Sequence, residues 1–176
     1  ASGGIGGEIA RVLHGAGAVV ALSGTREAPL QALAAELGAR AHVLPCNLSD
    51  AEAVEALPKA AIAAMGAVDI LVNNAGLAAG LSPLHEGNID DWEQMIDTNI
   101  KGLLYVTKQV SMIMIQNKKG HIINVGSIAG KEVYANGNVY CATKYAVDAL
   151  NKGMRIDLLP HGIKVSSVNP GMVETE

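Results

Sequence analysis

Aromatic side chains are scarce in this sequence: they make up 3% of its 176 residues, with one Trp and no Phe. The core must therefore be built from aliphatic side chains and Met, with little contribution from ring packing. There are only two cysteines, Cys46 and Cys141, and their wide separation excludes a paired metal-binding motif. We expect two reduced thiols in a cytoplasmic protein, and no metal site.

Long apolar runs and an excess of basic charge are also missing. No apolar run reaches the roughly 18 residues that a membrane-spanning helix requires, so we expect no membrane association. The net charge of −4 argues against nucleic-acid binding. The remaining composition, 49% apolar and 17% charged residues, is typical of a globular domain with a sizeable core.

Short apolar runs alternate with stretches of helical periodicity along the whole chain. The apolar runs predict strands at 18–23, 41–45, 68–73, 121–127 and 163–170. After a Gly-rich turn and helix within 1–17, further helices are predicted at 27–37, 50–65, 90–116 and 138–159. This alternation predicts an α/β fold, a Rossmann-like doubly wound parallel sheet that residues 1–176 form as a single domain. The nearly continuous apolar run at 68–73 predicts a strand buried on both faces.

Both ends of the chain are unusual for this architecture. A Gly-rich turn of this kind follows a strand, yet no strand precedes Ala1. The chain also ends at Glu176, just after the last predicted strand. We therefore expect a fragment of a longer protein, one that lacks the first strand and the C-terminal unit.

The Gly-rich turn has the composition of a phosphate-binding site. Residues 1–6 read Ala-Ser-Gly-Gly-Ile-Gly at the start of a predicted helix. Glycines let the backbone approach a pyrophosphate, and a helix N-terminus offers unpaired N–H groups and a positive dipole. We expect Gly4 and Gly6 to meet the pyrophosphate, with Ser2, Gly3 and Ile5 lining the turn. Such turns are also common structural elements, and the strand–helix alternation favours the functional interpretation.

The end of the second strand bears on the choice of cofactor. NAD sites usually place an acidic residue there to bind the ribose 2′-hydroxyl. This chain instead has Thr25 and Arg26, and no acidic residue stands between the predicted strand at 18–23 and Glu27. The planar guanidinium of Arg26 suits a 2′-phosphate, so we favour NADP(H) over NAD(H) as the cofactor. A solvated Arg26 in the first turn of the helix is the alternative interpretation.

Three side chains are candidates for proton transfer. Tyr140 and Lys144 are four residues apart in a predicted helix and therefore share one face. A phenol is a poor base at neutral pH, and a neighbouring ammonium favours its ionised form. Ser127 follows a buried strand, at the carboxyl edge where open α/β sheets bind ligands, and its hydroxyl could hold a substrate carbonyl or alcohol. A Tyr–Lys pair is usually an ordinary helix face, so this assignment depends on its context.

Further motifs supply that context. They are Asn73-Asn74-Ala75-Gly76, Asn99 within DTNIKG, Ser127 within NVGS, Tyr140-Cys141-Ala142-Thr143-Lys144 and Asn169-Pro170-Gly171. With the Gly-rich turn, these motifs resemble the short-chain dehydrogenase/reductase family along nearly the whole chain. The chain departs from the family at its start, where the opening Thr-Gly of the turn is missing.

The resemblance implies a catalytic tetrad. Tyr140 would act as the general acid in reduction, with Lys144 tuning its acidity and holding the nicotinamide ribose. Ser127 would position the substrate, and Asn99 would support a water that links Lys144 to solvent.

The resemblance also implies cofactor contacts beyond Tyr140 and Lys144. The adenosine and ribose side would be lined by Asn73, Ala75 and Gly76, and the adenine by Asn47 and Leu48. The nicotinamide end would meet Pro170, Gly171, Val173 and Thr175. Family members usually assemble, so a homodimer or homotetramer is expected.

The two parts of the chain resemble different members of the family. Residues 1–72 are similar to 3-oxoacyl-acyl-carrier-protein reductases, and residues 73–176 to NADP-dependent 3-hydroxy acid dehydrogenases that act on serine-like substrates. The change falls at the shared NNAG motif. A natural mosaic, a recombined sequence and a deliberate chimera would each explain it.

The leading functional expectation is an NADP(H)-dependent oxidoreductase with a small-molecule carbonyl or alcohol substrate. It would interconvert a 3-oxo and a 3-hydroxy group on a small hydroxy acid or acyl thioester, with Tyr140 as general acid/base. One alternative is a 3-oxoacyl-acyl-carrier-protein reductase of fatty-acid synthesis. Others are a non-catalytic dinucleotide-binding sensor and an inactive fragment. Fold alone does not separate a sensor from an enzyme, but a sensor has no need of a proton donor.

Overall fold

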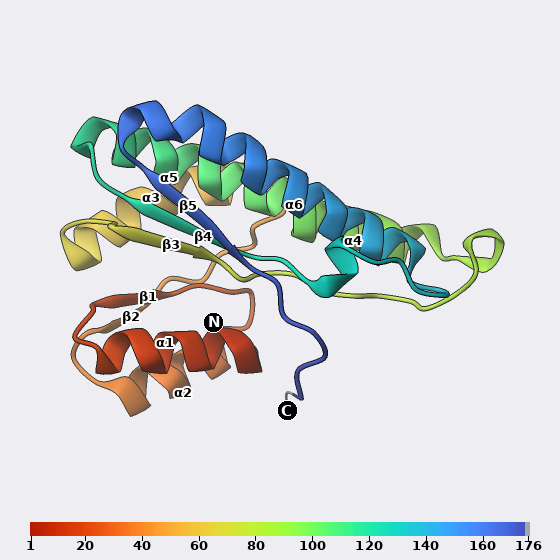
Figure 1. The fold of residues 1–176 in the computed structure, drawn as a ribbon. Coiled ribbons are helices and arrows are strands. Elements are labelled where there is room, and N and C mark those ends of the chain that lie inside the picture. Colours follow the sequence, from red (N-terminus) through yellow and green to blue (C-terminus); the bar gives the residue numbers. More distant parts are fainter. Residues whose placement is uncertain (175–176) are drawn as a thin grey trace.

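The computed structural model describes residues 1–174, which form two parallel β-sheets with helices on either side (Figure 1). The first sheet pairs β1 (Val20–Leu22) with β2 (Ala41–Val43). The second has the order β3 (Ile70–Asn73), β4 (His121–Val125) and β5 (Lys164–Val168). The expected α/β fold with parallel strands is confirmed.

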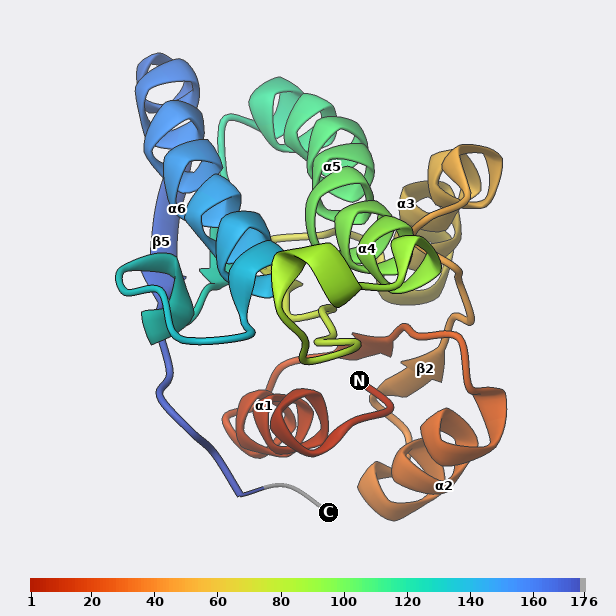
Figure 2. The ribbon, with the colours of Figure 1, turned by 90° about the vertical axis from the view of Figure 1, so that its right-hand side faces the viewer.

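Helices cover both faces, as a doubly wound fold requires. On one side, α1 (Gly4–Gly15) and α2 (Glu27–Leu37) lie beneath β1 and β2 (Figure 1). On the other side lie α3 (Ala51–Met65), α5 (Leu103–Asn117) and α6 (Asn138–Leu158). The segment after β5 leaves the three-stranded sheet and runs toward α1 (Figure 2). Within residues 1–174, no helix combines the length and apolarity needed to cross a membrane.

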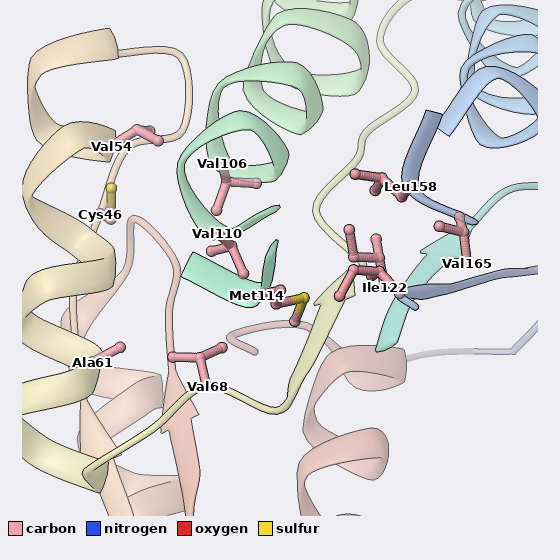
Figure 3. Packing of buried hydrophobic residues seen from close by; sticks show 11 residues of the cluster. Cys46, Val54, Ala61, Val68, Val106, Val110, Met114, Ile122, Leu158 and Val165 are labelled. Atoms are coloured by element: carbon pink, nitrogen blue, oxygen red, sulfur yellow. The ribbon is translucent and has the colours of Figure 1, made fainter. Parts of the chain in front are cut away.

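Apolar side chains gather in two clusters. The larger joins α3, α5, β4 and β5, and its most buried members are Val54, Met114 and Ile122, each 0% exposed (Figure 3). The smaller lies between β1, α1 and α2 and contains Leu22 and Leu30. The buried members of both clusters are aliphatic or sulfur-containing, which confirms the expected composition of the core. Both cysteines are free and buried, also as expected.

The strand predicted at 68–73 is shorter and more exposed than expected. β3 begins at Ile70, whose side chain is 44% exposed, and only Asn73 within the strand is buried. Among the described residues β3 pairs with β4 alone and forms an edge of its sheet. The prediction of a strand buried on both faces is therefore wrong, because an apolar run is buried only where neighbouring elements cover it.

The single helix predicted at 90–116 is a continuous helical run of three segments. These are α4 (Ile89–Ile96), the π-helical segment η2 (Asp97–Gly102) and α5. A π-helix bonds i to i+5, so it accommodates an additional residue in a turn, and such segments recur at functional sites. Asn99 lies in the π-helical segment and is 1% exposed. A polar side chain of the π-helical segment therefore lies in the interior.

Candidate active site

A cavity of ≈ 240 Å³ lies where the carboxyl ends of β3, β4 and β5 meet α6 and the turn before α1. Parallel strands deliver the loops that follow them to the same edge of a sheet, which is where open α/β sheets bind ligands. The cavity is lined by Ile5, Asn74, Gly76, Leu77, Ala78, Val125, Gly126, Ser127, Tyr140, Lys144, Pro170, Gly171 and Val173.

The three proton-transfer candidates all line this cavity. Tyr140 and Lys144 come from the N-terminal part of α6, and Lys144 Nζ lies 5.8 Å from the centroid of the Tyr140 ring. Ser127 directly precedes a short 3₁₀ helix, and its Oγ accepts a hydrogen bond from Ala129 N at 3.1 Å. Among residues 1–174 no protein atom accepts the hydrogen of the Ser127 hydroxyl, which leaves it able to donate to a ligand.

The Lys144 ammonium is buried, and its one hydrogen bond within residues 1–174 is to a backbone carbonyl. Its side chain is 7% exposed, and its ammonium donates to the Val125 carbonyl at 3.3 Å. Burial lowers the pKa of the Lys144 ammonium below its ordinary value, because charge is costly away from water. Gly76 faces the same ammonium: a Cβ on Gly76 would lie 3.4 Å from Lys144 Nζ and 3.3 Å from Asn99 Oδ1. Glycine therefore keeps the space between these two side chains open.

Asn99 is fixed by three hydrogen bonds. Its Nδ2 donates to the Leu77 carbonyl at 2.9 Å and to Thr143 Oγ1 at 3.0 Å. Its Oδ1 accepts from Leu77 N at 2.9 Å. Both amide hydrogens are therefore engaged within the protein, and the side chain joins the loop after β3 to α6. A water held by Asn99 would have to donate to one of its oxygen atoms.

Gly130 brings the loop after Ser127 close to α6. A Cβ at Gly130 would lie 2.6 Å from the Lys144 carbonyl oxygen, closer than a real Cβ approaches backbone. Only glycine lets the short 3₁₀ helix rest against the backbone of α6 at this point. This close approach sets the spacing between Ser127 and the face of α6 that carries Tyr140 and Lys144.

The Gly-rich turn, the end of β1 and the NNAG motif also meet. Arg26 donates from Nη2 to the Ser2 carbonyl at 2.7 Å. A Cβ on Gly6 would lie 2.8 Å from Asn74 Nδ2, whereas one on Gly3 would meet no heavy atom within 4 Å. The turn is thus tightly packed against Asn74 at Gly6 and has open space beside Gly3. The helix α1 begins at this turn with unpaired backbone N–H groups. This arrangement fits the pyrophosphate of a dinucleotide.

The structure brings many of the predicted residues together. Eight of them line the cavity: Ile5, Gly76, Ser127, Tyr140, Lys144, Pro170, Gly171 and Val173. The other members of the Gly-rich turn, Ser2, Gly3, Gly4 and Gly6, surround Ile5 at the start of α1. Ala75 is exposed in the loop after β3, and Thr25 is exposed beside Arg26. Thr175 lies outside the described residues.

The predicted cofactor residues Asn73, Asn47 and Leu48 also lie outside the cavity lining. The Asn73 amide is buried in the sheet and donates to Thr107 Oγ1 at 2.8 Å and Asn124 Oδ1 at 2.9 Å. The Asn47 side chain accepts from Ser49 N at 3.1 Å, and Leu48 packs against the larger apolar cluster. Their cofactor contacts stay predictions.

Sequence reasoning missed five residues that line the cavity: Asn74, Leu77, Ala78, Val125 and Gly126. Asn74 and Gly126 stand inside the NNAG and NVGS motifs, so their positions were signalled. A Cβ at Gly126 would lie 2.1 Å from Asn169 Oδ1, which explains the glycine. Val125 also stands inside the NVGS motif, whereas Leu77 and Ala78 carry no signal of their own and line the cavity because they directly follow the NNAG motif.

A parallel α/β fold with a Gly-rich turn at a helix N-terminus, and a Ser–Tyr–Lys group at the strand ends, defines a dinucleotide-binding oxidoreductase. The short chain dehydrogenase family model matches residues 1–176, and the chain belongs to this family.

Named relatives agree with this membership. The chain is 43% identical over 173 residues to the NADP-dependent 3-hydroxy acid dehydrogenase YdfG of Salmonella typhi, covering 98% of this chain and 70% of that protein. A serine dehydrogenase solved in its closed form with NADP⁺ superimposes with a TM-score of 0.96 at 41% identity, covering 99% of this chain and 71% of the other. A 3-ketoacyl-(acyl-carrier-protein) reductase from Brucella melitensis, solved with NADH, also has a TM-score of 0.96, at 28% identity, covering 99% and 74%.

These similarities confirm the expected family, fold and oxidoreductase class. Both groups that the two parts of the chain resemble occur among the relatives. The similarity to the hydroxy acid dehydrogenase extends to both sides of the NNAG motif, because it covers 98% of the chain.

Proposed function

We propose that this chain carries the active site of an NADP(H)-dependent oxidoreductase that interconverts a 3-oxo and a 3-hydroxy group on a small hydroxy acid or acyl thioester. The observation that carries the proposal is the convergence of Ser127, Tyr140 and the buried Lys144 on one cavity at the strand ends. The identity of more than 40% to proteins named 3-hydroxy acid dehydrogenase and serine dehydrogenase favours the hydroxy acid as substrate.

The chemistry divides between the nicotinamide and the side chains. A bound nicotinamide supplies or accepts the hydride. In the direction of reduction, the Tyr140 hydroxyl donates its proton to the carbonyl oxygen as the alcohol forms. The Ser127 hydroxyl, whose oxygen accepts from Ala129 N, donates its hydrogen to the same carbonyl oxygen and holds it beside Tyr140. The ammonium of Lys144 then stabilises the negative charge that proton transfer leaves on the tyrosine.

The cofactor is proposed to extend from the Gly-rich turn to the segment after β5. Gly4 and Gly6 would lie against the pyrophosphate, where the N-terminus of α1 stabilises negative charge. Arg26, held by the Ser2 carbonyl, would meet the 2′-phosphate that distinguishes NADP from NAD. The nicotinamide ribose would bind at Lys144. The Pro170–Gly171 backbone would face the nicotinamide, because this segment closes the cavity on that side.

A paired assay on the full-length protein that carries this chain tests the proposal. NADPH and NADH are each combined with 3-oxoacyl thioesters, and NADP⁺ and NAD⁺ with free 3-hydroxy acids such as serine and 3-hydroxybutyrate. We expect turnover with the NADP pair and the free acids, followed by nicotinamide absorbance. Turnover confined to the thioesters would favour the acyl-carrier-protein reductase instead. Cofactor binding without turnover on any carbonyl would favour the sensor, and an absence of both would indicate an inactive fragment.

The cofactor preference should depend on Arg26. Replacing it in an Arg26→Ala variant should raise the KM for NADPH about 10- to 100-fold, since a hydrogen bond to a charged group contributes about 1.5–3 kcal/mol. The KM for NADH should change little, because NADH has no 2′-phosphate.

Arg40→Ala provides the matched control, because the Arg40 guanidinium also contacts a backbone carbonyl, that of Ala18, at 3.5 Å. It should leave both KM values unchanged. Equal losses with NADPH and NADH in Arg26→Ala would show that Arg26 merely supports the turn through Ser2, and would contradict 2′-phosphate recognition.

A further inference from the structure

Thr143 occupies the buried face of α6 between the two catalytic residues of that helix. Its side chain is 1% exposed, and it does not belong to the cavity lining. Its hydroxyl makes two hydrogen bonds: it donates to the Tyr140 carbonyl at 2.7 Å and accepts from Asn99 Nδ2 at 3.0 Å. The hydroxyl therefore connects two members of the tetrad and touches no reacting atom.

These bonds belong to a longer chain. The backbone of Leu77 pairs with the Asn99 amide through both its N–H and its carbonyl, and Asn99 bonds in turn to Thr143. The loop after β3, the π-helical segment and the first turns of α6 are thereby joined by hydrogen bonds of 2.7–3.0 Å. Because buried polar groups are costly without partners, a fully paired network of this kind holds one geometry.

The bond to Tyr140 acts directly on the catalytic turn. In a regular α-helix the carbonyl of Tyr140 accepts from the N–H of Lys144, four residues later. The Thr143 hydroxyl supplies a second donor to the same carbonyl, and Ser or Thr side chains that bond back in this way adjust the local course of a helix. The turn that carries both Tyr140 and Lys144 is therefore held from its buried side.

We propose that Thr143 is a positioning residue, which ties Asn99 to the Tyr140 backbone and so fixes the tyrosine relative to the cavity wall at Gly76 and Leu77. This inference rests on the proposed function, because it assigns Thr143 a part in the same reaction. Thr143 would affect the placement of the proton donor, and its replacement would leave the cofactor and substrate contacts unchanged.

Two variants of the full-length protein separate the hydroxyl from the shape of the side chain. Thr143→Val keeps the shape and removes both hydrogen bonds, whereas Thr143→Ser keeps the hydroxyl. We expect Thr143→Val to lower kcat by about 10- to 100-fold, because small misplacements at a reacting centre have effects of this size. The KM values should stay within about threefold of wild type, since ground-state binding is retained. Thr143→Ser should recover most of the lost kcat.

The pH profile of kcat supplies a readout that a purely structural role would not move. It reports the ionisation of the catalytic acid in the complex, so it should shift in Thr143→Val and return to the wild-type profile in Thr143→Ser. Thr107→Val is the matched control: it removes another buried hydroxyl, 5% exposed, which accepts from Asn73 at 2.8 Å. Both valine variants should lower Tm by about 2–4 °C, but only Thr143→Val should alter the profile.

Wild-type kcat or an unmoved pH profile in Thr143→Val would overturn the inference, as would a failure of Thr143→Ser to recover activity. A wild-type protein without turnover would instead overturn the proposed function. In that case the Asn99 side-chain amide still tests the link by NMR. One of its two amide protons should lose protection from solvent exchange in Thr143→Val, and unchanged protection of both would overturn the inference independently of catalysis.

Discussion

A Tyr140→Phe variant should lose nearly all turnover while it continues to bind NADPH. The change removes one oxygen atom and keeps the ring, so the packing of α6 and the cavity wall are preserved. General acid catalysis contributes about 10²–10⁴-fold, and kcat should fall by about that factor. Steady-state kinetics measures the loss, and a fluorescence titration with NADPH measures the retained binding.

Tyr145→Phe is the control for this experiment. Tyr145 lies five residues further along α6, is 42% exposed, and donates its hydroxyl to the Lys131 carbonyl outside the cavity. The same chemical change at this position should leave kcat near the wild-type value. If Tyr140→Phe kept more than about a tenth of the wild-type kcat, the loss would fall below the range of general acid catalysis, and the role assigned to Tyr140 would be wrong.

The second large effect is expected at Lys144, where activity and stability should change in opposite directions. Lys144→Met should lower kcat by at least about 100-fold, because it removes the charge that we propose assists proton transfer. It should also raise the free energy of unfolding at neutral pH by about 1 kcal/mol, since a well-packed apolar side chain often stabilises the folded protein more than a buried ion does. Lys144 is 7% exposed, and Met fills a similar volume without the cost of a desolvated ammonium.

The stability gain should depend on pH in a defined direction. The pKa of Lys144 is lower in the folded protein than in the unfolded chain, so between these two pKa values the unfolded chain binds more protons. The wild type therefore gains stability as the pH rises through that window. The advantage of Lys144→Met should be complete below the folded pKa and vanish above the ordinary lysine pKa. Urea unfolding at neutral and alkaline pH measures it.

Lys59→Met serves as the comparison, because Lys59 is an exposed residue of α3. Its free energy of unfolding should stay within about 0.5 kcal/mol of wild type at each pH. A Lys144→Met variant that is less stable than wild type at neutral pH would mean that the bond to the Val125 carbonyl outweighs the cost of burying the charge.

The cavity of the candidate active site was largely predictable, because parallel strands bring distant residues to one edge of a sheet. Ser127 follows one apolar run, and Tyr140 and Lys144 share a helical face, so their convergence needed only the expected topology. Motif resemblance does not state where a side chain points. The structure adds that the Asn73 amide is bonded inside the sheet, and its cofactor contact stays a prediction.

The π-helical segment and the buried, hydrogen-bonded position of Thr143 were not predicted from the sequence, for a common physical reason. Helical periodicity assigns polar residues to the solvent side, yet Asn99 and Thr143 are each 1% exposed. Asn99 is tolerated in the interior because the Leu77 backbone and the Thr143 hydroxyl bond to its amide. Thr143 is tolerated there because its hydroxyl bonds to Asn99 and to the Tyr140 carbonyl. A hydrogen bond between two residues that are 44 positions apart cannot be predicted from the local pattern around either of them.

The division of the interior into two apolar clusters has a consequence for cooperativity. Elements that share few apolar contacts open as separate units, so amide hydrogen exchange should report different opening free energies for the α1–β1–α2–β2 unit and for the remainder. A dinucleotide that meets Ile5 and Arg26 in one unit and Lys144 in the other would bind only when both are closed. By linkage, cofactor saturation would raise the protection of both units together and make the chain behave as one cooperative body.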